Sequence, residues 1–219
     1  MHLRNATYKL YYSPAACSLA VHAVLNALGA AFELVRTDLD SKDNHAEAYL
    51  HLNPLGQVPV LVAGDRVMKE SAAIMICLLD NAAHPLLPQK GDARIKAMEW
   101  LLFFNSTMHQ AYSAHFLIAN NIGSATDGVA ALQITSRRIQ KLWRYVGGQA
   151  QTDFLCGDAP TVGDIMMAVI ANWSVRIKPP CAIPANVAAM CARVSRLPYV
   201  AKAIATEGVT YTIAPDLPV

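Results

Sequence analysis

One cysteine stands where a short strand is expected to turn into a helix. Residues 8–12 (YKLYY) are typical of the strand, Ser13-Pro14 of the turn, and apolar residues follow Cys17 at mostly helical intervals. Free backbone N–H groups and the helix dipole favour an anion at such a helix N-terminus. The position therefore predicts a Cys17 thiol with a lowered pKa that could act as a nucleophile. The alternative is a cysteine that only fills space under the first turn.

Two further motifs have groups that could bind a peptide-like ligand. Val58-Pro59 opens a predicted strand. A cis bond there would turn the N–H and C=O of Val58 outward to pair with an extended peptide, whereas an ordinary trans proline is the commoner case. Glu70-Ser71 begins the next predicted helix. Its N–H groups and hydroxyl suit a carboxylate and Glu70 suits an ammonium, so the pair fits an α-amino acid head group; a routine helix cap is the alternative.

The elements that must position these motifs fall into two halves. The first half predicts a β-α-β-α-β-β-α order, in which the strand–helix–strand step implies a parallel pair and Gly64-Asp65 a hairpin. After a proline-containing linker only helices are expected. The predicted strands are 8–12, 32–39, 58–63 and 66–69; the predicted helices follow Cys17 and cover 43–50, 70–82, 93–120, 126–146, 161–175, 185–195 and 198–206.

The composition excludes several classes of protein. The chain has 219 residues, of which 54% are apolar and 16% charged, so it has enough apolar surface to fold. A net charge of +2 gives no field for nucleic acid and no polybasic membrane anchor. The longest clean apolar run, 165–171, is far short of the ~20 residues that span a bilayer. The first residues, MHLRNAT, lack the apolar core of a secretory signal.

The five cysteines occur without a CxxC motif or metal-like spacing. We therefore expect free thiols in a reducing, cytoplasmic environment and no metal site. Cys77, Cys156, Cys181 and Cys191 are interpreted as structural thiols, because none opens a predicted helix beside a recognisable site.

Four segments in this order resemble the glutathione transferases, with the closest likeness to the bacterial beta class. They are KLYYSPAACSLAVHAVLNALG, NPLGQVPVL, MEWLLFFNSTMHQAYSAHF and FLCGDAPTVGDI, and the resemblance runs from about Tyr8 to Gly208. It implies a thioredoxin-like, glutathione-binding domain over 1–83, a linker over 84–92, and an all-helical domain over 93–219 with a site for the electrophile. It also implies a homodimer with glutathione as co-substrate.

The resemblance also assigns roles to individual residues. Cys17 would lie beside the glutathione sulfur, and His109 would approach it from the first helix of the second domain. Tyr112 and Phe116 share a helix face with His109, at i+3 and i+7, whereas His115 is off that face and receives no role. The implied glutathione-binding residues are Lys42, Gln57, Val58, cis Pro59, Glu70 and Ser71, and the electrophile site is Tyr112, Phe116 and Trp173.

Other positions either support the fold or depart from the family pattern. Thr161 and Asp164 resemble the family's N-capping box, which is a folding signal. Leu102 stands where beta-class proteins often have asparagine, and Thr107 where they often have glutamate. These departures lower the expected affinity for the γ-glutamyl end of glutathione. The seven residues before Tyr8 are an extension without an assigned role.

The resulting hypothesis is a glutathione transferase that conjugates glutathione to small apolar electrophiles, acting on no nucleic acid or membrane. Thiol–disulfide exchange or peroxide reduction through Cys17 is a variant of it, in which a second glutathione resolves a mixed disulfide. Tyr11, Tyr12 or Ser13 could supply an activating hydroxyl in place of Cys17. A non-catalytic interaction protein on the same scaffold is the main rival. A dithiol reductase is disfavoured, because Pro14 and Ala20 stand where a second cysteine would be needed.

Overall fold

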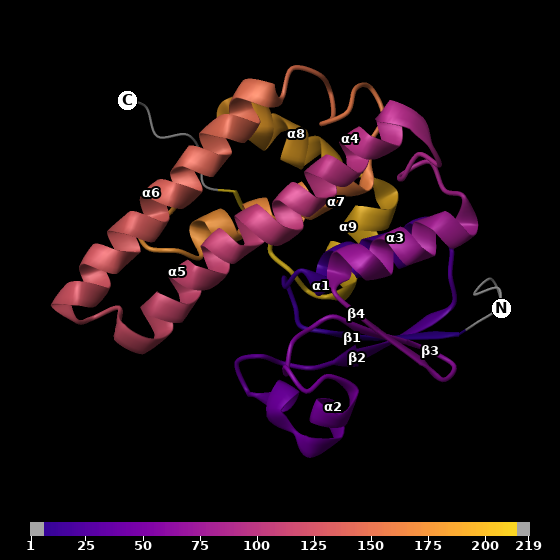
Figure 1. Cartoon of the computed structure of the whole chain (residues 1–219), viewed down its shortest axis with the longest axis horizontal. Coiled ribbons are helices and arrows are strands. Elements are labelled where there is room, and N and C mark those ends of the chain that lie inside the picture. The colour runs from indigo at the N-terminus through magenta and orange to yellow at the C-terminus, as the bar shows by residue number, and fades with distance from the viewer. Residues whose placement is uncertain (1–6, 214–219) are drawn as a thin grey trace.

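The computed structural model describes residues 7–213, and its first half is a four-stranded sheet flanked by helices (Figure 1). Residues 1–6, which are most of the predicted extension, and residues 214–219 lie outside the described part. The second half is a set of helices packed against one another and against the helices on one face of the sheet (Figure 1). The predicted fold class, a thioredoxin-like α/β half followed by an all-helical half, is confirmed.

The sheet is mixed and has the order β2-β1-β3-β4. β1 pairs in parallel with β2 and antiparallel with β3, and β3 forms a hairpin with β4. β3 begins two residues later than predicted, because Pro59 has no N–H to donate to a ladder. β2 ends three residues earlier, where the Asp38 carboxylate accepts the N–H of Asp40 (2.9 Å) and turns the chain. The strands are β1 (Tyr8–Tyr12), β2 (Phe32–Arg36), β3 (Val60–Ala63) and β4 (Arg66–Lys69).

Helices cover the two faces of this sheet unequally. α1 (Ser18–Ala27) and α3 (Ser71–Ala82) lie on one face, and α2 (Glu47–Leu52) lies on the other side (Figure 1). The helix predicted at 43–50 is in fact two pieces, η2 (Asp43–His45) and α2, because Ala46 between them is extended. The helical half packs on the face of the sheet that α1 and α3 cover.

The helical half follows the predicted order, but one predicted helix is split, and the one predicted over 161–175 ends in the 3-10 turn η4 (Asn172–Val175). The single helix expected over 93–120 is split by η3 (Phe103–Met108), a turn of π-helix that the apolar periodicity does not predict. α5 and α6 form an antiparallel hairpin after the break at Gly123. The helices are α4 (Gly91–Leu102), α5 (His109–Ile122), α6 (Thr126–Gln149), α7 (Val162–Ala171), η4 (Asn172–Val175), α8 (Ala185–Ser195) and α9 (Pro198–Thr206).

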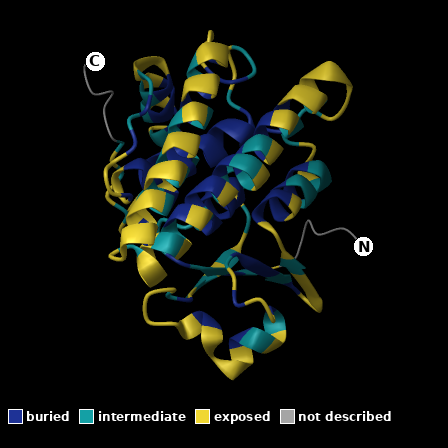
Figure 2. Ribbon diagram, turned by 60° about the vertical axis from the view of Figure 1, so that its left-hand side comes forward, coloured by how far each residue is buried: buried dark blue, intermediate teal, exposed yellow. Residues whose placement is uncertain are grey.

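α7 forms the centre of the helical half. All of its residues are buried, and Figure 2 shows it in dark blue behind more exposed helices. It packs against α4, α8 and α1. Gly163 allows this approach, because a Cβ there would lie 2.9 Å from the Cβ of Trp100. No helix in 7–213 combines the length and the apolar character needed to cross a membrane.

The N-terminus of α7 has the predicted capping box. The hydroxyl of Thr161 lies 2.8 Å from Asp164 Oδ2, which also accepts the Thr161 N–H at 2.7 Å, while Oδ1 accepts the Leu155 N–H at 2.8 Å. Asp164 is completely buried, and this burial raises the pKa of its carboxyl. The polar groups at this helix end therefore bond one another within the protein.

Candidate active site

The loop between β1 and α1 carries Cys17 and is closed by two serines. The Ser18 hydroxyl donates to the Ser13 carbonyl (3.2 Å) and accepts the Ser13 N–H (3.3 Å). Ala15, between them, has the left-handed φ of +59°. These contacts fix the turn from which the α1 helix begins.

The Cys17 thiol is buried and donates its S–H to the Val58 carbonyl at 3.5 Å. Burial raises the pKa of this thiol to about 11. The N–H groups of Cys17 and Ser18 and the Ser71 hydroxyl act in the opposite direction, but they do not offset the loss of solvation. The prediction of a lowered Cys17 pKa is therefore wrong for this protein without a ligand, because desolvation outweighs the helix N-terminus.

The Val58-Pro59 bond is cis, as the resemblance implies. The Val58 carbonyl is directed at Cys17. This contact places the Val58 carbonyl beside the candidate nucleophile. The preceding residues are anchored by side chains that no sequence motif indicates. Asn44 donates to the Gly56 carbonyl, and both Tyr49 and Asn53 donate to the Gln57 carbonyl, each at 2.7 Å.

Glu70 and Ser71 stand at the start of α3, as predicted. Glu70 is exposed and has a left-handed φ of +65°, whereas Ser71 is buried. The Ser71 hydroxyl donates to Asn105 Oδ1 at 2.7 Å. Asn105 was not identified from the sequence, and it brings an amide to this helix end although Leu102 has none and is exposed to solvent.

Two other predicted glutathione-binding side chains lie on the surface. Lys42 is exposed and has a left-handed backbone at the start of η2. Gln57 is also exposed, and its carbonyl is held as described above. Both therefore have side chains free to turn toward a ligand at the Val58 end of the site.

An aromatic cluster joins the helical half to the Cys17 loop. The Trp173 ring lies 5.1 Å from the His109 ring and 6.2 Å from the Phe116 ring, measured between centroids. The Trp173 indole N–H donates to the Ala15 carbonyl at 2.7 Å. Burial lowers the pKa of His109, and its Nδ1 lies 3.1 Å from the Ser113 hydroxyl. The structure thus brings His109, Phe116 and Trp173 together beside the loop.

Tyr112 contacts the same cluster from the protein interior. Its side chain is fully buried, and its hydroxyl accepts the indole N–H of Trp143 at 2.9 Å. The ring packs against Trp173 at 5.8 Å. The hypothesis that Tyr112 lines the electrophile site is therefore corrected: its hydroxyl is already bonded, and its ring supports Trp173 from below.

The remaining cysteines and histidines are side chains of the kind that bind metal ions. Among the residues described, no group of three His, Cys, Asp or Glu side chains could hold a metal ion. The five cysteines are all free thiols, and Cys181 and Cys191 are buried as expected, while Cys77 and Cys156 are partly exposed. His115 is buried against Thr135, with Nδ1 2.9 Å from the threonine hydroxyl.

A thioredoxin-like sheet, a thiol loop against a cis-proline and an attached helical half define the class of glutathione-dependent transferases, and comparison with known proteins agrees. Residues 6–78 match the family model described as Glutathione S-transferase, N-terminal domain. The chain is 30% identical to Glutathione S-transferase GstA of Escherichia coli O157:H7 over 206 residues, which cover 91% of this chain and 98% of that protein. It therefore belongs to the glutathione S-transferase family.

Solved structures extend the likeness over nearly the whole chain. A glutathione S-transferase from Xylella fastidiosa superposes with a TM-score of 0.83 at 28% identity, covering 93% of this chain and all of that one (100%). BphK, a bacterial glutathione S-transferase solved as a ternary complex, has a TM-score of 0.74 at 32% identity, covering 92% and 100%. The resemblance to bacterial members of the family is thus confirmed, and the protein is a glutathione transferase.

Proposed function

We propose that this transferase conjugates glutathione to small apolar electrophiles and that the thiol of bound glutathione, not Cys17, is the nucleophile. The observation that carries this choice is the state of Cys17. Its S–H is donated to the Val58 carbonyl, and burial raises its pKa to about 11. A neutral, buried thiol is a poor nucleophile for disulfide exchange or peroxide reduction.

The polar side of the site supports a γ-glutamyl tripeptide as ligand. The start of α3 offers backbone N–H groups to a carboxylate, and the Ser71 hydroxyl would turn from Asn105 to donate to the same group. Exposed Glu70 offers a carboxylate to an ammonium group. Val58 next to cis Pro59 would pair with the cysteinyl backbone, while Lys42 and Gln57 would reach the glycine end. This arrangement would direct the ligand sulfur toward the N-terminus of α1.

The aromatic side supports an apolar second substrate. The partly exposed rings of His109 and Phe116 flank Trp173, whose only ring N–H is already donated to Ala15. The Trp173 and Phe116 rings therefore offer no further hydrogen-bond donor to a polar substrate. Because burial lowers the pKa of His109, its ring is held neutral and could accept the thiol proton.

The chemical step is a substitution at carbon. The glutathione S–H bond breaks, and its proton passes to His109 or to water. The thiolate sulfur donates its electron pair to the electrophilic carbon, a C–S bond forms, and the leaving group departs with the electrons of its bond. The amides at the start of α1 would stabilise the thiolate, whose free pKa is roughly 8.5.

Two variants test the assignment of the nucleophile. Cys17→Ala is expected to keep conjugation of an activated aryl chloride within about threefold of wild type, since no bond to Cys17 forms in the step. His109→Ala is expected to lose about tenfold or more if the ring takes the thiol proton. If Cys17→Ala loses conjugation and the wild type catalyses thiol–disulfide exchange, Cys17 is the nucleophile and the chemistry is thiol exchange.

The ionisation of Cys17 can be measured separately. The rate at which Cys17 is alkylated in the protein without glutathione should rise with a midpoint near pH 11, as its pKa of about 11 requires. A midpoint near or below neutrality would mean a resident thiolate and would favour the redox variant.

We also propose that the protein is a homodimer. Ile95 and Leu102 on α4 are 66% and 43% exposed, and Val67 on the edge strand β4 adds a third exposed apolar side chain. Apolar side chains of this kind support a contact between copies. Light scattering at micromolar concentrations should give twice the chain mass; a constant monomer mass would contradict the proposal.

A further inference from the structure

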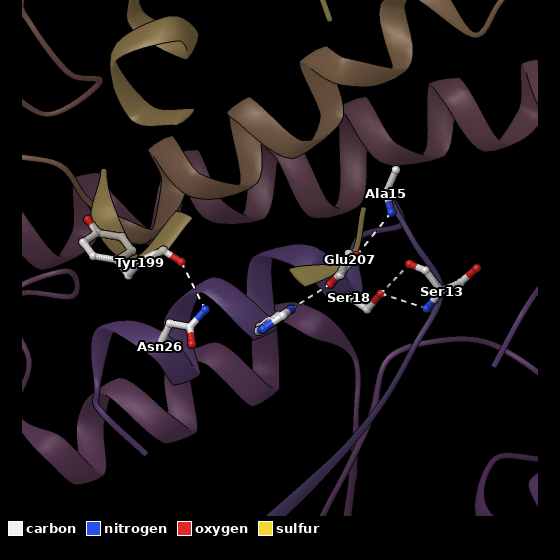
Figure 3. A network of polar contacts seen from close by, with 7 residues as sticks. Ser13, Ala15, Ser18, Asn26, Tyr199 and Glu207 are labelled. Carbon is white, nitrogen blue, oxygen red and sulfur yellow. Dashed lines mark hydrogen bonds and ion pairs between the residues drawn. The ribbon is translucent and has the colours of Figure 1, made fainter. Parts of the chain in front are cut away.

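The peptide of Ala15 is held from two sides by the helical half of the chain. Its carbonyl accepts the Trp173 indole N–H at 2.7 Å, and its N–H donates to Glu207 Oε2 at 3.3 Å. Figure 3 shows Glu207 reaching the loop beside the Ser13–Ser18 turn. Two residues remote in sequence thus bond both polar groups of one residue near Cys17.

Glu207 is placed where its own helix does not favour it. It follows the last turn of α9, and a carboxylate is disfavoured at a helix C-terminus. Its side chain is 0% exposed, and burial raises its pKa. The other carboxylate oxygen lies 3.0 Å from Nδ1 of His22, which is also buried. Its described partners are therefore His22 on α1 and the Ala15 peptide.

Ala15 adopts a conformation that alanine rarely takes. Its φ of +59° is left-handed, which brings the Cβ of an L-residue too close to the backbone. Such a conformation persists only where surrounding contacts fix it. The contacts that Ala15 makes through its peptide are the bonds to Glu207 and Trp173.

We propose that Glu207 and Trp173 are positioning residues that hold Ala15 in its left-handed conformation and thereby fix the Cys17 loop. The loop in turn keeps the Cys17 thiol against the Val58 carbonyl. The same clamp would set the position of the α1 N-terminus that faces the glutathione sulfur; this consequence alone rests on the proposed function.

The test measures alkylation of Cys17 by iodoacetamide in the full chain without glutathione, quantified by peptide mass spectrometry. Glu207→Ala should raise the rate about five- to thirtyfold, which is the population change that the cost of a left-handed alanine allows. Ala15→Gly in the same chain should bring the rate back to within about threefold of wild type, because glycine takes positive φ freely. Glu207→Gln keeps an acceptor for the Ala15 N–H and should stay near wild type.

Asn26→Ala is the matched control. Asn26 Nδ2 donates to the Tyr199 carbonyl at 3.2 Å, so it links the same helices, α1 and α9, without contact to Ala15 (Figure 3). It should leave the Cys17 rate unchanged. An equal rise in Asn26→Ala, or a Glu207→Ala rate that Ala15→Gly does not lower, would overturn the proposal and leave Glu207 a packing residue.

Trp173→Phe provides an independent arm if Glu207→Ala does not fold. It keeps a single aromatic ring and removes the pyrrole part of the indole, which includes the N–H that binds the Ala15 carbonyl. A raised Cys17 rate that Ala15→Gly reverses supports the proposal, and an unchanged rate contradicts it. Because alkylation needs no glutathione, failure here is distinct from failure of the proposed conjugation. In an active protein, Glu207→Ala should raise the KM for glutathione more than it lowers kcat.

Discussion

The first N–H groups of α7 are bonded differently from those of α1 and α3. Every α-helix leaves its first N–H groups without intrahelical partners. At α7, Thr161 and Asp164 form a capping box within the buried core. At α1 and α3, the N-cap residues Cys17 and Glu70 make no side-chain cap. The first arrangement completes the fold with side chains. At α1 the N–H groups of Leu19 and Ala20 donate to the carbonyls of Ala16 and Cys17, so the donors offered to a ligand are the N–H groups of Cys17 and Ser18 and those at the start of α3.

The two kinds of helix start also differ in backbone conformation. Thr161 is extended, the ordinary conformation of an N-cap residue. Glu70 itself and Ala15, two residues before Cys17, both have positive φ. Strain of this kind gathers at functional sites, because contacts elsewhere must hold it. Here Glu207 bonds Ala15 itself, and Asn105 bonds Ser71, the residue after Glu70, both from the helical half.

The largest effect on stability is expected when the Asp164 carboxylate is removed. Asp164→Ala loses the capping box and leaves the Leu155 N–H buried without its acceptor. We expect the free energy of unfolding to fall by about 2–4 kcal/mol, from a lost cap and an unsatisfied donor together. Urea unfolding followed by circular dichroism measures it. Glu70→Ala is the control at the open helix and should change stability by less than about 0.5 kcal/mol.

A loss in Glu70→Ala as large as that in Asp164→Ala would show that both helix starts serve the fold. The starts of α7 and α3 would then contribute equally to stability, and the distinction between a capped and an open helix start would be wrong.

Removing the Ser71 hydroxyl tests the open helix start for binding. Ser71→Ala should weaken glutathione binding about five- to thirtyfold, the effect of losing one hydrogen bond to a charged group. Asn105→Ala breaks the same internal bond from its other end but keeps the hydroxyl, so its effect on binding should be smaller. Calorimetric titration of both variants gives the ratio. Equal affinity of Ser71→Ala and wild type would remove Ser71 from the glutathione site.

The smallest expected effect concerns pH and the helical half. Burial lowers the pKa of His115, so the folded chain keeps it neutral at a pH where the unfolded chain binds a proton. The stability from this group is therefore complete above pH 6.5 and is lost as the pH falls through the folded pKa. His115→Gln should reduce the acid loss of stability only in part, because burial lowers the pKa values of His84 and His109 in the same direction. Unfolding free energies of variant and wild type between pH 5 and 7 that run parallel would contradict this.

Most of the fold follows from local patterns in the sequence. The strands and helices were predictable because apolar periodicity and breaks at Gly64 and Gly123 report local geometry. The π-helical turn at 103–108 was not, since a change of helical phase leaves no periodic signal. Asn105 lies in this turn, and its contact with Ser71 was missed as well.

The sequence predicted that the candidate residues lie close together, but not the pKa of the thiol among them. The order of motifs identified Cys17, Val58 and Ser71, all of which the structure places near one another. The raised pKa of Cys17 depends on burial by distant elements, which a helix N-terminus in the sequence does not reveal. Glu207 lies 192 residues from Ala15 along the chain, so their contact appears only in three dimensions.

The most direct test of the account is calorimetric titration of the reduced protein and of Cys17→Ala with glutathione. The account predicts that both bind with a Kd at or below roughly 1 mM, because the open helix starts and Val58 hold the ligand without a bond to Cys17. No detectable binding by either protein would contradict the central claim and would favour an interaction protein on a transferase scaffold.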